Sequence, residues 1–310
     1  MKKIATCSAK WRARCVARVR GAKPLAALEA CVARAVAARD GEVLLAAVSG
    51  GPDSVALAAL LARICDGGRC TLVLGHVNHG LRDSAWQDEA VTLSLGASLG
   101  ARVLTGSLPP GSSDEARLRD ERYATLLGMA AVCGARRVFT AHHAADQTET
   151  VLLSLFRGAG PSGLCGMPAA RELGPGVELV RPLLGVEPEA LRAYCAALHL
   201  PFVLDPTNLE IEYRRNALRS ALPALRAAFP KLDAAVARCA AILAEERAGS
   251  QVAAVRERLR AELVAATGDA RDVTFERLDA AARAIERGSR GRHFLRRGVE
   301  MVSGSKKGPA

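Results

Sequence analysis

The sequence lacks the features that would place the chain in a membrane or on a secretory route. Half of its 310 residues are apolar, yet no uninterrupted apolar run is long enough to span a bilayer. The first residues are basic, but neither a sustained apolar stretch nor a cleavage pattern follows them. These absences argue against a membrane protein and against a secretory signal.

Paired cysteines are also absent. The chain has nine cysteines, but none belongs to a Cys-x-x-Cys pair. The nearest two, Cys65 and Cys70, are separated by four residues, which fits neither a zinc knuckle nor a redox pair. An odd number of scattered cysteines predicts reduced thiols and therefore a cytoplasmic location.

The net charge of +11 is unevenly distributed. Residues 1–40 carry ten basic and two acidic side chains, residues 41–230 carry 17 and 19, and residues 231–310 carry 16 and 11. A near-neutral body with basic ends is typical of a protein that binds a polyanion such as RNA. The general bias toward arginine and alanine explains the surplus equally well, so charge alone leaves both interpretations open.

Short apolar strands alternate with helices in the first half of the chain. We expect strands at 43–48, 71–77, 102–105 and 138–141, and helices at 55–64, 85–99, 113–132 and 146–156. This alternation predicts βαβ units, and hence an α/β fold with a doubly wound parallel sheet. The Gly- and Pro-rich residues 158–176 predict a long loop that could cover a site, and 178–183 predict a last strand.

The same pattern predicts four regions along the chain. Residues 1–40 form a basic N-terminal extension, with a helix expected at 27–38. The sheet domain occupies 41–219 and a smaller all-helical domain occupies 220–301, with breaks expected at Pro223 and Pro230. Residues 302–310 are expected to be a disordered tail.

A glycine-containing loop lies between the first predicted strand and its helix. Its residues are Ser49, Gly50, Gly51, Pro52, Asp53 and Ser54. The glycines let the backbone approach a ligand closely, and the helix start attracts an anion. The loop lacks the Gly-Lys-Ser/Thr of a Walker A motif, so it suits a pyrophosphate that leaves better than a γ-phosphate that is transferred. We expect an ATP site for adenylate transfer, in preference to an ordinary strand–helix turn.

Two more polar segments follow predicted strands, at 76–82 and 141–150. Ligands bind beyond the carboxyl ends of the strands in an open parallel sheet. His142, His143, Asp146 and Glu149 could be interpreted as a metal cluster, but a stable zinc site usually has more soft ligands. Asp53 and Asp146 better suit Mg²⁺ held chiefly by phosphate oxygens.

Together these segments resemble the N-type ATP-pyrophosphatase (PP-loop) superfamily, which has the adenine nucleotide alpha hydrolase-like fold, and within it the tRNA(Ile)-lysidine synthetase family. The superfamily match is the loop at 49–54. The narrower match rests on segments in the family's order: 76–82, 115–123, 142–150, 157–160, 181–184 and 205–208, with Arg215, Asn216 and Arg219. It covers about residues 43 to 225 and corresponds to a short form of the family.

The resemblance implies a two-step reaction on isoleucine tRNA with a CAU anticodon. The C2 oxygen of the wobble cytidine attacks the α-phosphate of ATP, and pyrophosphate leaves. The ε-amine of L-lysine then attacks C2 and expels AMP, which gives lysidine.

The resemblance also implies roles for particular residues. The loop at 49–54 would hold the pyrophosphate, with Asp53 near Mg²⁺, and the backbone at Val77 and Asn78 would contact the adenine. Four residues are implied to be catalytic: Asp53; Arg122 and His142, which would offset charge on the α-phosphate; and Asp146, which would place or deprotonate the lysine amine. The implied tRNA contacts are Arg215, Asn216 and Arg219, and the basic residues from Arg283 to Arg297 are a further RNA-binding candidate.

One residue departs from the family's pattern. Ala145 stands where the first of two adjacent aspartates is usual, which puts a two-carboxylate metal scheme in doubt and leaves Asp146 to act alone. Two alternative functions stay open. A tRNA thiolation enzyme of the same superfamily would rely on cysteines, and a non-catalytic RNA- or nucleotide-binding module would bind tRNA without releasing pyrophosphate. Nothing in the sequence indicates an oligomeric state.

Overall fold

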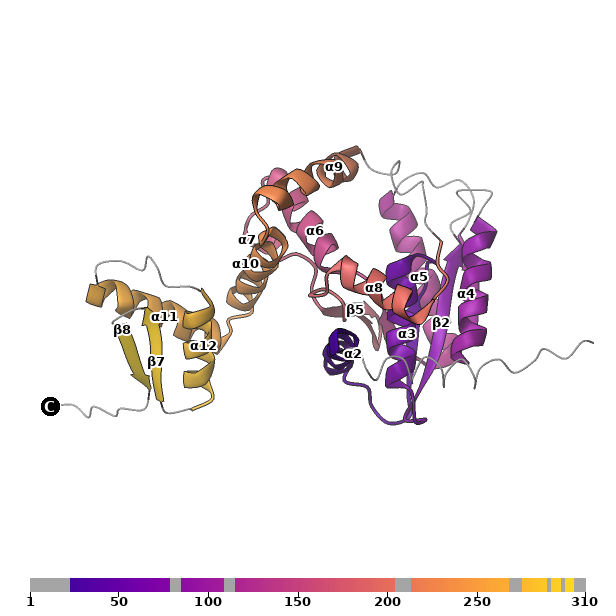
Figure 1. The fold of residues 1–310 in the computed structure, drawn as a ribbon, viewed down its shortest axis with the longest axis horizontal. Coiled ribbons are helices and arrows are strands. Elements are labelled where there is room, and N and C mark those ends of the chain that lie inside the picture. Colours follow the sequence, from indigo (N-terminus) through magenta and orange to yellow (C-terminus); the bar gives the residue numbers. More distant parts are fainter. Residues whose placement is uncertain are drawn as a thin grey trace, which may run out of the picture. The chain divides into compact units, whose positions relative to one another are not determined.

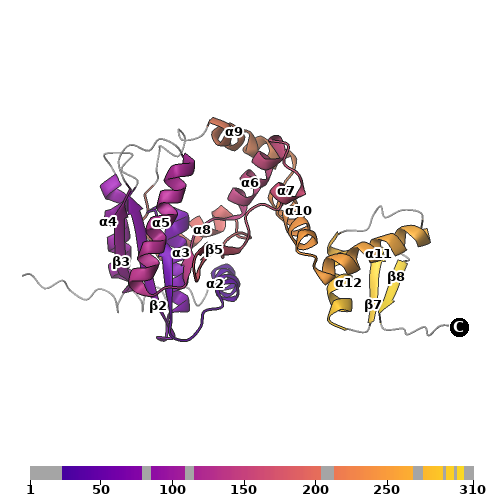
Figure 2. The same ribbon diagram turned by 180° about the vertical axis from the view of Figure 1, so that it is seen from behind.

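The computed structural model describes residues 23–78, 85–108, 115–203, 213–267, 275–288, 291–296 and 299–303. These residues belong to two compact units, one drawn from 1–153 and 166–237 and the other from 154–165 and 238–310. Figures 1 and 2 show the elements of both units from opposite sides. None of the described helices combines the length and the apolar character needed to cross a bilayer.

The first unit is built on a six-stranded sheet with the strand order β3-β2-β1-β4-β6-β5. All neighbouring strands are parallel, except that β5 pairs antiparallel with β6 at one edge. This arrangement confirms the predicted α/β class with a doubly wound, mostly parallel sheet. The strands are β1 (Glu42–Ala47), β2 (Cys70–Asn78), β3 (Arg102–Ser107), β4 (Arg137–Phe139), β5 (Ala170–Gly174) and β6 (Val177–Val180).

Helices cover both faces of this sheet. The core on one face includes residues from α2 (Lys23–Val36), α3 (Pro52–Ile64), α4 (Ala85–Leu99) and α8 (Pro188–Leu198). The core on the other face is covered by α5 (Glu115–Cys133), which Figure 2 shows beside β2 and β3. Side chains of β1 alternate between the two cores: Leu44 and Ala46 belong to the first, and Leu45 belongs to the second. Burial on both faces explains why the middle of each central strand is largely apolar.

The segment at 158–176 contains more regular structure than predicted. A short helix, α7 (Pro161–Leu164), and the edge strand β5 replace the expected long loop. The prediction was wrong because β5 has the sequence Ala-Arg-Glu-Leu-Gly, with no apolar run. An edge strand pairs on one side only and can carry charged residues, so its sequence gives little signal.

Three further helices follow β4 and α8 in the chain. They are α6 (Ala144–Phe156), α9 (Tyr213–Ala228) and α10 (Leu232–Arg247). The break expected at Pro223 was wrong, because α9 continues through that residue. The chain does leave the helix before Pro230, as expected.

The second unit contains α11 (Gln251–Thr267), α12 (Phe275–Glu286) and an antiparallel pair of strands, β7 (Gly291–Arg296) and β8 (Val299–Ser303). Its helices agree with the expected helical C-terminal region, but the strand pair was not predicted. The limits predicted at residues 41, 220 and 302 stay predictions. The small apolar core is formed by Val252, Leu259, Leu263, Leu278, Ala281 and Ala282.

Candidate active site

The strand order of the sheet reverses between β1 and β4. β2 lies on one side of β1 and is connected to it through α3, while β4 lies on the other side. In doubly wound sheets, ligands bind beyond the carboxyl ends of the strands at such a point. The 49–54 loop follows β1, and residues 140–143 follow β4. Two of the polar segments noted in the sequence therefore meet here.

The loop at 49–54 is shaped by Gly50 and Ser54. Gly50 has a φ of 87°, and a Cβ atom at this position would lie 3.1 Å from the backbone and side chain of Asp88. The Oγ atom of Ser54 accepts a hydrogen bond from the Ser49 N–H at 3.1 Å and donates one to the Gly51 carbonyl at 2.9 Å. The Ser54 hydroxyl therefore braces the loop.

The start of α3 is arranged to meet an anion. Pro52 opens the helix, and no side chain caps its first turn. The N–H groups of a first helical turn have no partner within the helix, so an uncapped start leaves donors for a ligand. Asp53 also lies in this first turn, where it adds a carboxylate beside the anion site.

His143 lies between two carboxylates next to the loop. Its Nε2 atom is 3.5 Å from Oδ2 of Asp53, and its Nδ1 atom is 3.5 Å from Oδ2 of Asp146. The backbone N–H of His143 also donates a hydrogen bond to Asp146 at 3.0 Å. Burial alone would lower the pKa of His143, but Asp53, Asp146 and Glu149 together raise it. Burial raises the pKa of Asp146, partly opposed by the nearby His143.

His142, the preceding residue, lies in the opposite electrostatic environment. Burial and the positive charges of Arg181, Arg122 and Arg119 lower its pKa to about 3. Its Nδ1 atom is 3.0 Å from the Thr140 hydroxyl oxygen. His142 is therefore neutral at pH 7 and can contribute a hydrogen bond. The positive charge on this side of the site comes from the arginines.

The carboxylate of Glu149 connects α6 to α9. It accepts hydrogen bonds from Nε of Arg215 at 2.9 Å and from Nε of Arg219 at 2.7 Å, and it is buried. Both arginines were expected to contact tRNA, and that role stays a prediction. Sequence reasoning missed the function of Glu149 as an anchor, although its position three residues after Asp146 places both carboxylates on the same side of α6.

Other expected site residues lie around this centre. The Val77 side chain is part of the core under α5, and the Asn78 carbonyl accepts a hydrogen bond from Leu108 at 2.9 Å. Their contact with adenine stays a prediction. Arg122 has its guanidinium carbon 5.3 Å from the centre of the Tyr123 ring. Outside the described residues are 79–82, 205–208 and the side chain of Asn216.

The side chains at the start of α6 were considered in the sequence as possible metal ligands. Asp146 is the acidic residue in the first turn, and the preceding residue, Ala145, is buried and supplies no carboxylate. Among the described residues, no three His, Cys, Asp or Glu side chains are grouped as metal ligands. The metal-cluster interpretation of residues 142–149 therefore gains no support.

The fold and the site are those of a PP-loop protein: the family model described as a PP-loop domain matches residues 25–225. Curated relatives define the family within this class. A tRNA(Ile)-lysidine synthase of Symbiobacterium thermophilum is 37% identical over 287 residues, which cover 87% of this chain and 57% of that protein. A protein of the same name from Bordetella pertussis is 40% identical over 246 residues, which cover 76% and 72%. This chain belongs to the tRNA(Ile)-lysidine synthase family.

The chain spans little more than half of the Symbiobacterium protein. Among solved structures, the U34-tRNA thiolase NcsA from Methanococcus maripaludis with its [4Fe-4S] cluster is similar, with a TM-score of 0.61 and 14% identity, covering 70% of this chain and 77% of that one. At this identity, the similarity concerns the fold alone.

Proposed function

We propose that the chain ligates L-lysine to C2 of the wobble cytidine of isoleucine tRNA with a CAU anticodon, with ATP converted to AMP and pyrophosphate. The observation that carries the proposal is the divided charge of the site. Asp53 and Asp146 lie beside His143, whereas the positive charges of Arg181, Arg122 and Arg119 act on His142. A reaction that stabilises a phosphate and also receives an ammonium group needs preorganised charge of both signs.

In the first step, the C2 oxygen of the cytidine attacks the α-phosphorus of ATP, and the bond to pyrophosphate breaks. The N–H groups at the start of α3 would hold the leaving pyrophosphate. Arg122 would offset the negative charge that develops on the α-phosphate, while the neutral His142 would donate a hydrogen bond. This refines the role expected for His142, because its imidazole carries no charge before ATP binds.

Asp53 has the properties of a contact to Mg²⁺. Its Oδ1 atom is buried and has no hydrogen-bond partner among the described residues. A hard cation held chiefly by phosphate oxygens is completed by one or two carboxylates of this kind. When bound, Mg²⁺ would neutralise charge on the phosphate oxygens, and His143 would hold the Asp53 carboxylate in place.

In the second step, the ε-amine of lysine attacks C2, and the bond between C2 and the phosphate oxygen breaks to release AMP. The ammonium group of lysine must lose a proton before it attacks. Asp146 would accept it, because burial raises the pKa of this carboxyl and so increases its proton affinity. Glu149 lies on α6, as Asp146 does, and it holds Arg215 and Arg219 of α9. The expected tRNA contacts of α9, which include Asn216, would therefore lie close to Asp146.

Labelled lysine provides the test. The protein is incubated with ATP, Mg²⁺, radiolabelled lysine and either unmodified isoleucine CAU tRNA or methionine tRNA. We expect label in the isoleucine tRNA alone, together with stoichiometric pyrophosphate. Label in neither tRNA would contradict lysine ligation, and tRNA binding without pyrophosphate release would point to a binding module. Label in both would contradict the proposed tRNA specificity. Because ATP, lysine and tRNA are all substrates here, the proposal includes a cytoplasmic location.

A further inference from the structure

A second group of charged side chains surrounds Tyr123 on the α5 side of the sheet. The guanidinium carbons of Arg171, Arg122 and Arg119 lie 5.0, 5.3 and 5.5 Å from the centre of the Tyr123 ring. Burial acts to raise the pKa of Tyr123, but the charges of Arg119, Arg122 and Arg181 outweigh it and lower the pKa. We call Arg119, Arg122, Tyr123, Arg171 and Arg181 the arginine–tyrosine cluster.

Three buried polar atoms of this cluster lack a hydrogen bond of normal geometry among the described residues, although the Tyr123 hydroxyl interacts with Arg122 and Arg181. Tyr123 is 5% exposed and Arg181 is 3% exposed. The three atoms are Tyr123 Oη, Arg122 Nε and Arg181 Nε. No described carboxylate forms an ion pair with the four arginines. Buried donors and like charges at this density are unfavourable, and an anion that accepts their hydrogen bonds would relieve both costs.

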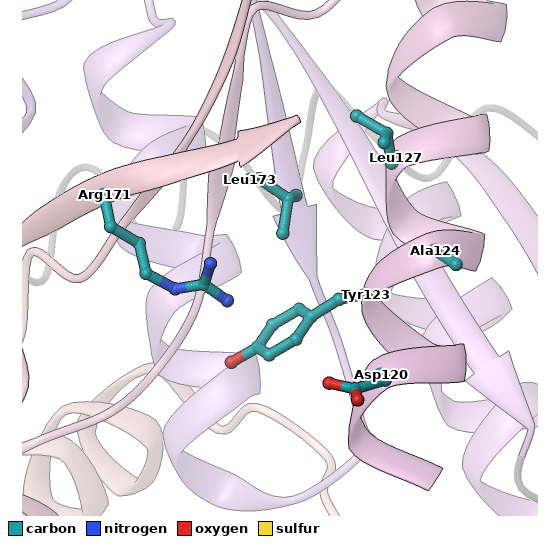
Figure 3. Close-up of a pocket in the computed structure, with 6 residues that line it drawn as sticks. All are labelled: Asp120, Tyr123, Ala124, Leu127, Arg171 and Leu173. Atoms are coloured by element: carbon teal, nitrogen blue, oxygen red, sulfur yellow. The ribbon is translucent and has the colours of Figure 1, made fainter. Parts of the chain in front are cut away.

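The cluster is accessible from outside through a hollow between α5 and β5. This hollow has a volume of about 280 Å³ and is lined by Asp120, Tyr123, Ala124, Leu127, Arg171 and Leu173. Figure 3 shows Tyr123 extending from α5 and Arg171 extending from β5 toward the same space, with Asp120 near the ring. The Arg171 guanidinium therefore offers donors to a ligand that enters here, while the Tyr123 ring lines the hollow.

The strand register places Arg171 close to the ligand-binding edge of the sheet. Arg171 is paired with Leu179 of β6, which is paired with Val138 of β4. Leu179 and Val138 belong to the core under α5, so Arg171 projects from the same face. Val138 and Leu179 each precede the last residue of their strand, and Arg171 follows Ala170, the partner of the last residue of β6. In agreement with this position, the charges of Arg181, Arg122 and Arg119 lower the pKa of His142.

The location of the cluster indicates the source of the anion. β5 is three strand spacings from β1, about 14 Å across the sheet, and the pyrophosphate loop follows β1. The expected adenine contacts are on β2, which lies on the far side of β1 from β5. The adenine and the pyrophosphate of ATP would therefore lie away from the cluster, with only the α-phosphate near Arg122, and a further anion at β5 would belong to the acceptor. Arginine forks match the oxygens of a phosphate group.

We propose that the arginine–tyrosine cluster holds a backbone phosphate of the RNA, next to the nucleotide that enters the site. This inference rests on the proposed function and assigns it an RNA contact on the α5–β5 side. Arg171 contacts the phosphate oxygens, and the buried Tyr123 hydroxyl and Arg181 support it from behind. The Asp120 carboxylate at the hollow weakens the attraction.

The test compares RNA and ATP binding in matched variants. Arg171→Ala removes one fork, Arg171→Lys keeps the charge, and Asp120→Asn removes the opposing carboxylate. Arg102→Ala is the control, because Arg102 is an exposed arginine at the amino end of β3, away from the carboxyl ends where the site lies. The dissociation constant of unmodified isoleucine CAU tRNA is measured at several salt concentrations. ATP binding is measured without RNA by calorimetry, and folding is checked by the melting temperature.

We expect Arg171→Ala to weaken tRNA binding about tenfold. The slope of log affinity against log salt should fall by roughly 0.7–0.9, the value for one phosphate contact. Arg171→Lys should recover part of the affinity, and Asp120→Asn should tighten binding. The inference is overturned if Arg171→Ala weakens ATP binding to the same degree, or if it affects tRNA no more than Arg102→Ala. If Arg171→Ala weakens tRNA binding as expected but the wild-type protein transfers no lysine to tRNA, the proposed reaction is refuted and the phosphate contact stands.

Discussion

His142 and His143 are neighbours in the chain, but they face opposite charges. His142 lies toward the arginines and is neutral, while His143 lies between Asp53 and Asp146 and gains affinity for a proton. Both histidines lie in the segment between β4 and α6, which has no regular secondary structure. No periodic pattern in the sequence therefore indicates which side chain faces the carboxylates and which faces the arginines. The pair therefore divides the site into an anion side and a cation side.

The ionisation of His143 gives a prediction at the scale of single residues. Replacing Asp53 with Asn should lower the pKa of His143, because one of the two charges that oppose desolvation is removed. A raised folded-state pKa stabilises the fold at low pH, and this contribution is lost as the pH rises through that pKa. In Asp53→Asn the stabilising contribution of protonated His143 should be lost at lower pH than in the wild-type protein, because the pKa of His143 is lower. NMR titration of the histidine side chains measures the shift.

Two controls define this result. The exposed Asp66→Asn should leave the pKa of His143 unchanged, and His142 should stay neutral above about pH 4 in both variants, as expected for a group near pKa 3. Asp53→Asn should also abolish pyrophosphate release. An unchanged pKa for His143 in Asp53→Asn would show that the 3.5 Å contact does not control its charge.

At the scale of elements, the central strands and the loop could be predicted from the sequence because each has a strong local signal. β1 and β2 are largely apolar since both faces are buried, and the loop at 49–54 combines glycines, a proline and an acidic residue at a helix start. β5 could not be predicted, because its place is determined by pairing with β6 and by packing of Gly174 against Leu127. The partners of Glu149 lie 66 and 70 residues away in the chain, so no local pattern indicates them.

Gly50 provides the prediction for the loop as an element. Gly50→Ala should destabilise the fold by about 1–3 kcal/mol, since a positive φ is costly for alanine and its Cβ would press on Asp88. ATP binding should weaken as well, because the loop must shift. The matched control is Gly128→Ala, within α5, where an added Cβ meets nothing within 4 Å. That variant should be neutral or more stable by up to about 1 kcal/mol. Urea unfolding and ATP calorimetry measure both, and equal effects at the two glycines would contradict the loop geometry.

At the scale of the whole molecule, basic residues are divided between binding and internal pairing. Arg283 was among the basic residues expected to contact RNA, yet it pairs with Asp279 and Glu245 within the second unit. Arg256, whose side chain is 6% exposed, pairs with the same two carboxylates. Part of the positive charge in the C-terminal region is therefore neutralised inside that unit, which a count of charges along the chain cannot reveal.

This ion-pair network predicts that the two units lose stability separately. Arg256→Ala leaves Glu245 and Asp279 with Arg283 as their shared partner, and breaking a buried ion pair costs about 3–5 kcal/mol. Hydrogen exchange should accelerate in α11 and α12, while β1 and α3 of the first unit keep their protection, because all four residues of the network lie in the second unit. ATP binding should persist, since the loop at 49–54 is in the first unit. The control Arg258→Ala removes an exposed pair with Glu262 and should change stability by less than about 1 kcal/mol. Equal acceleration of exchange in both units after Arg256→Ala would mean that they unfold as one.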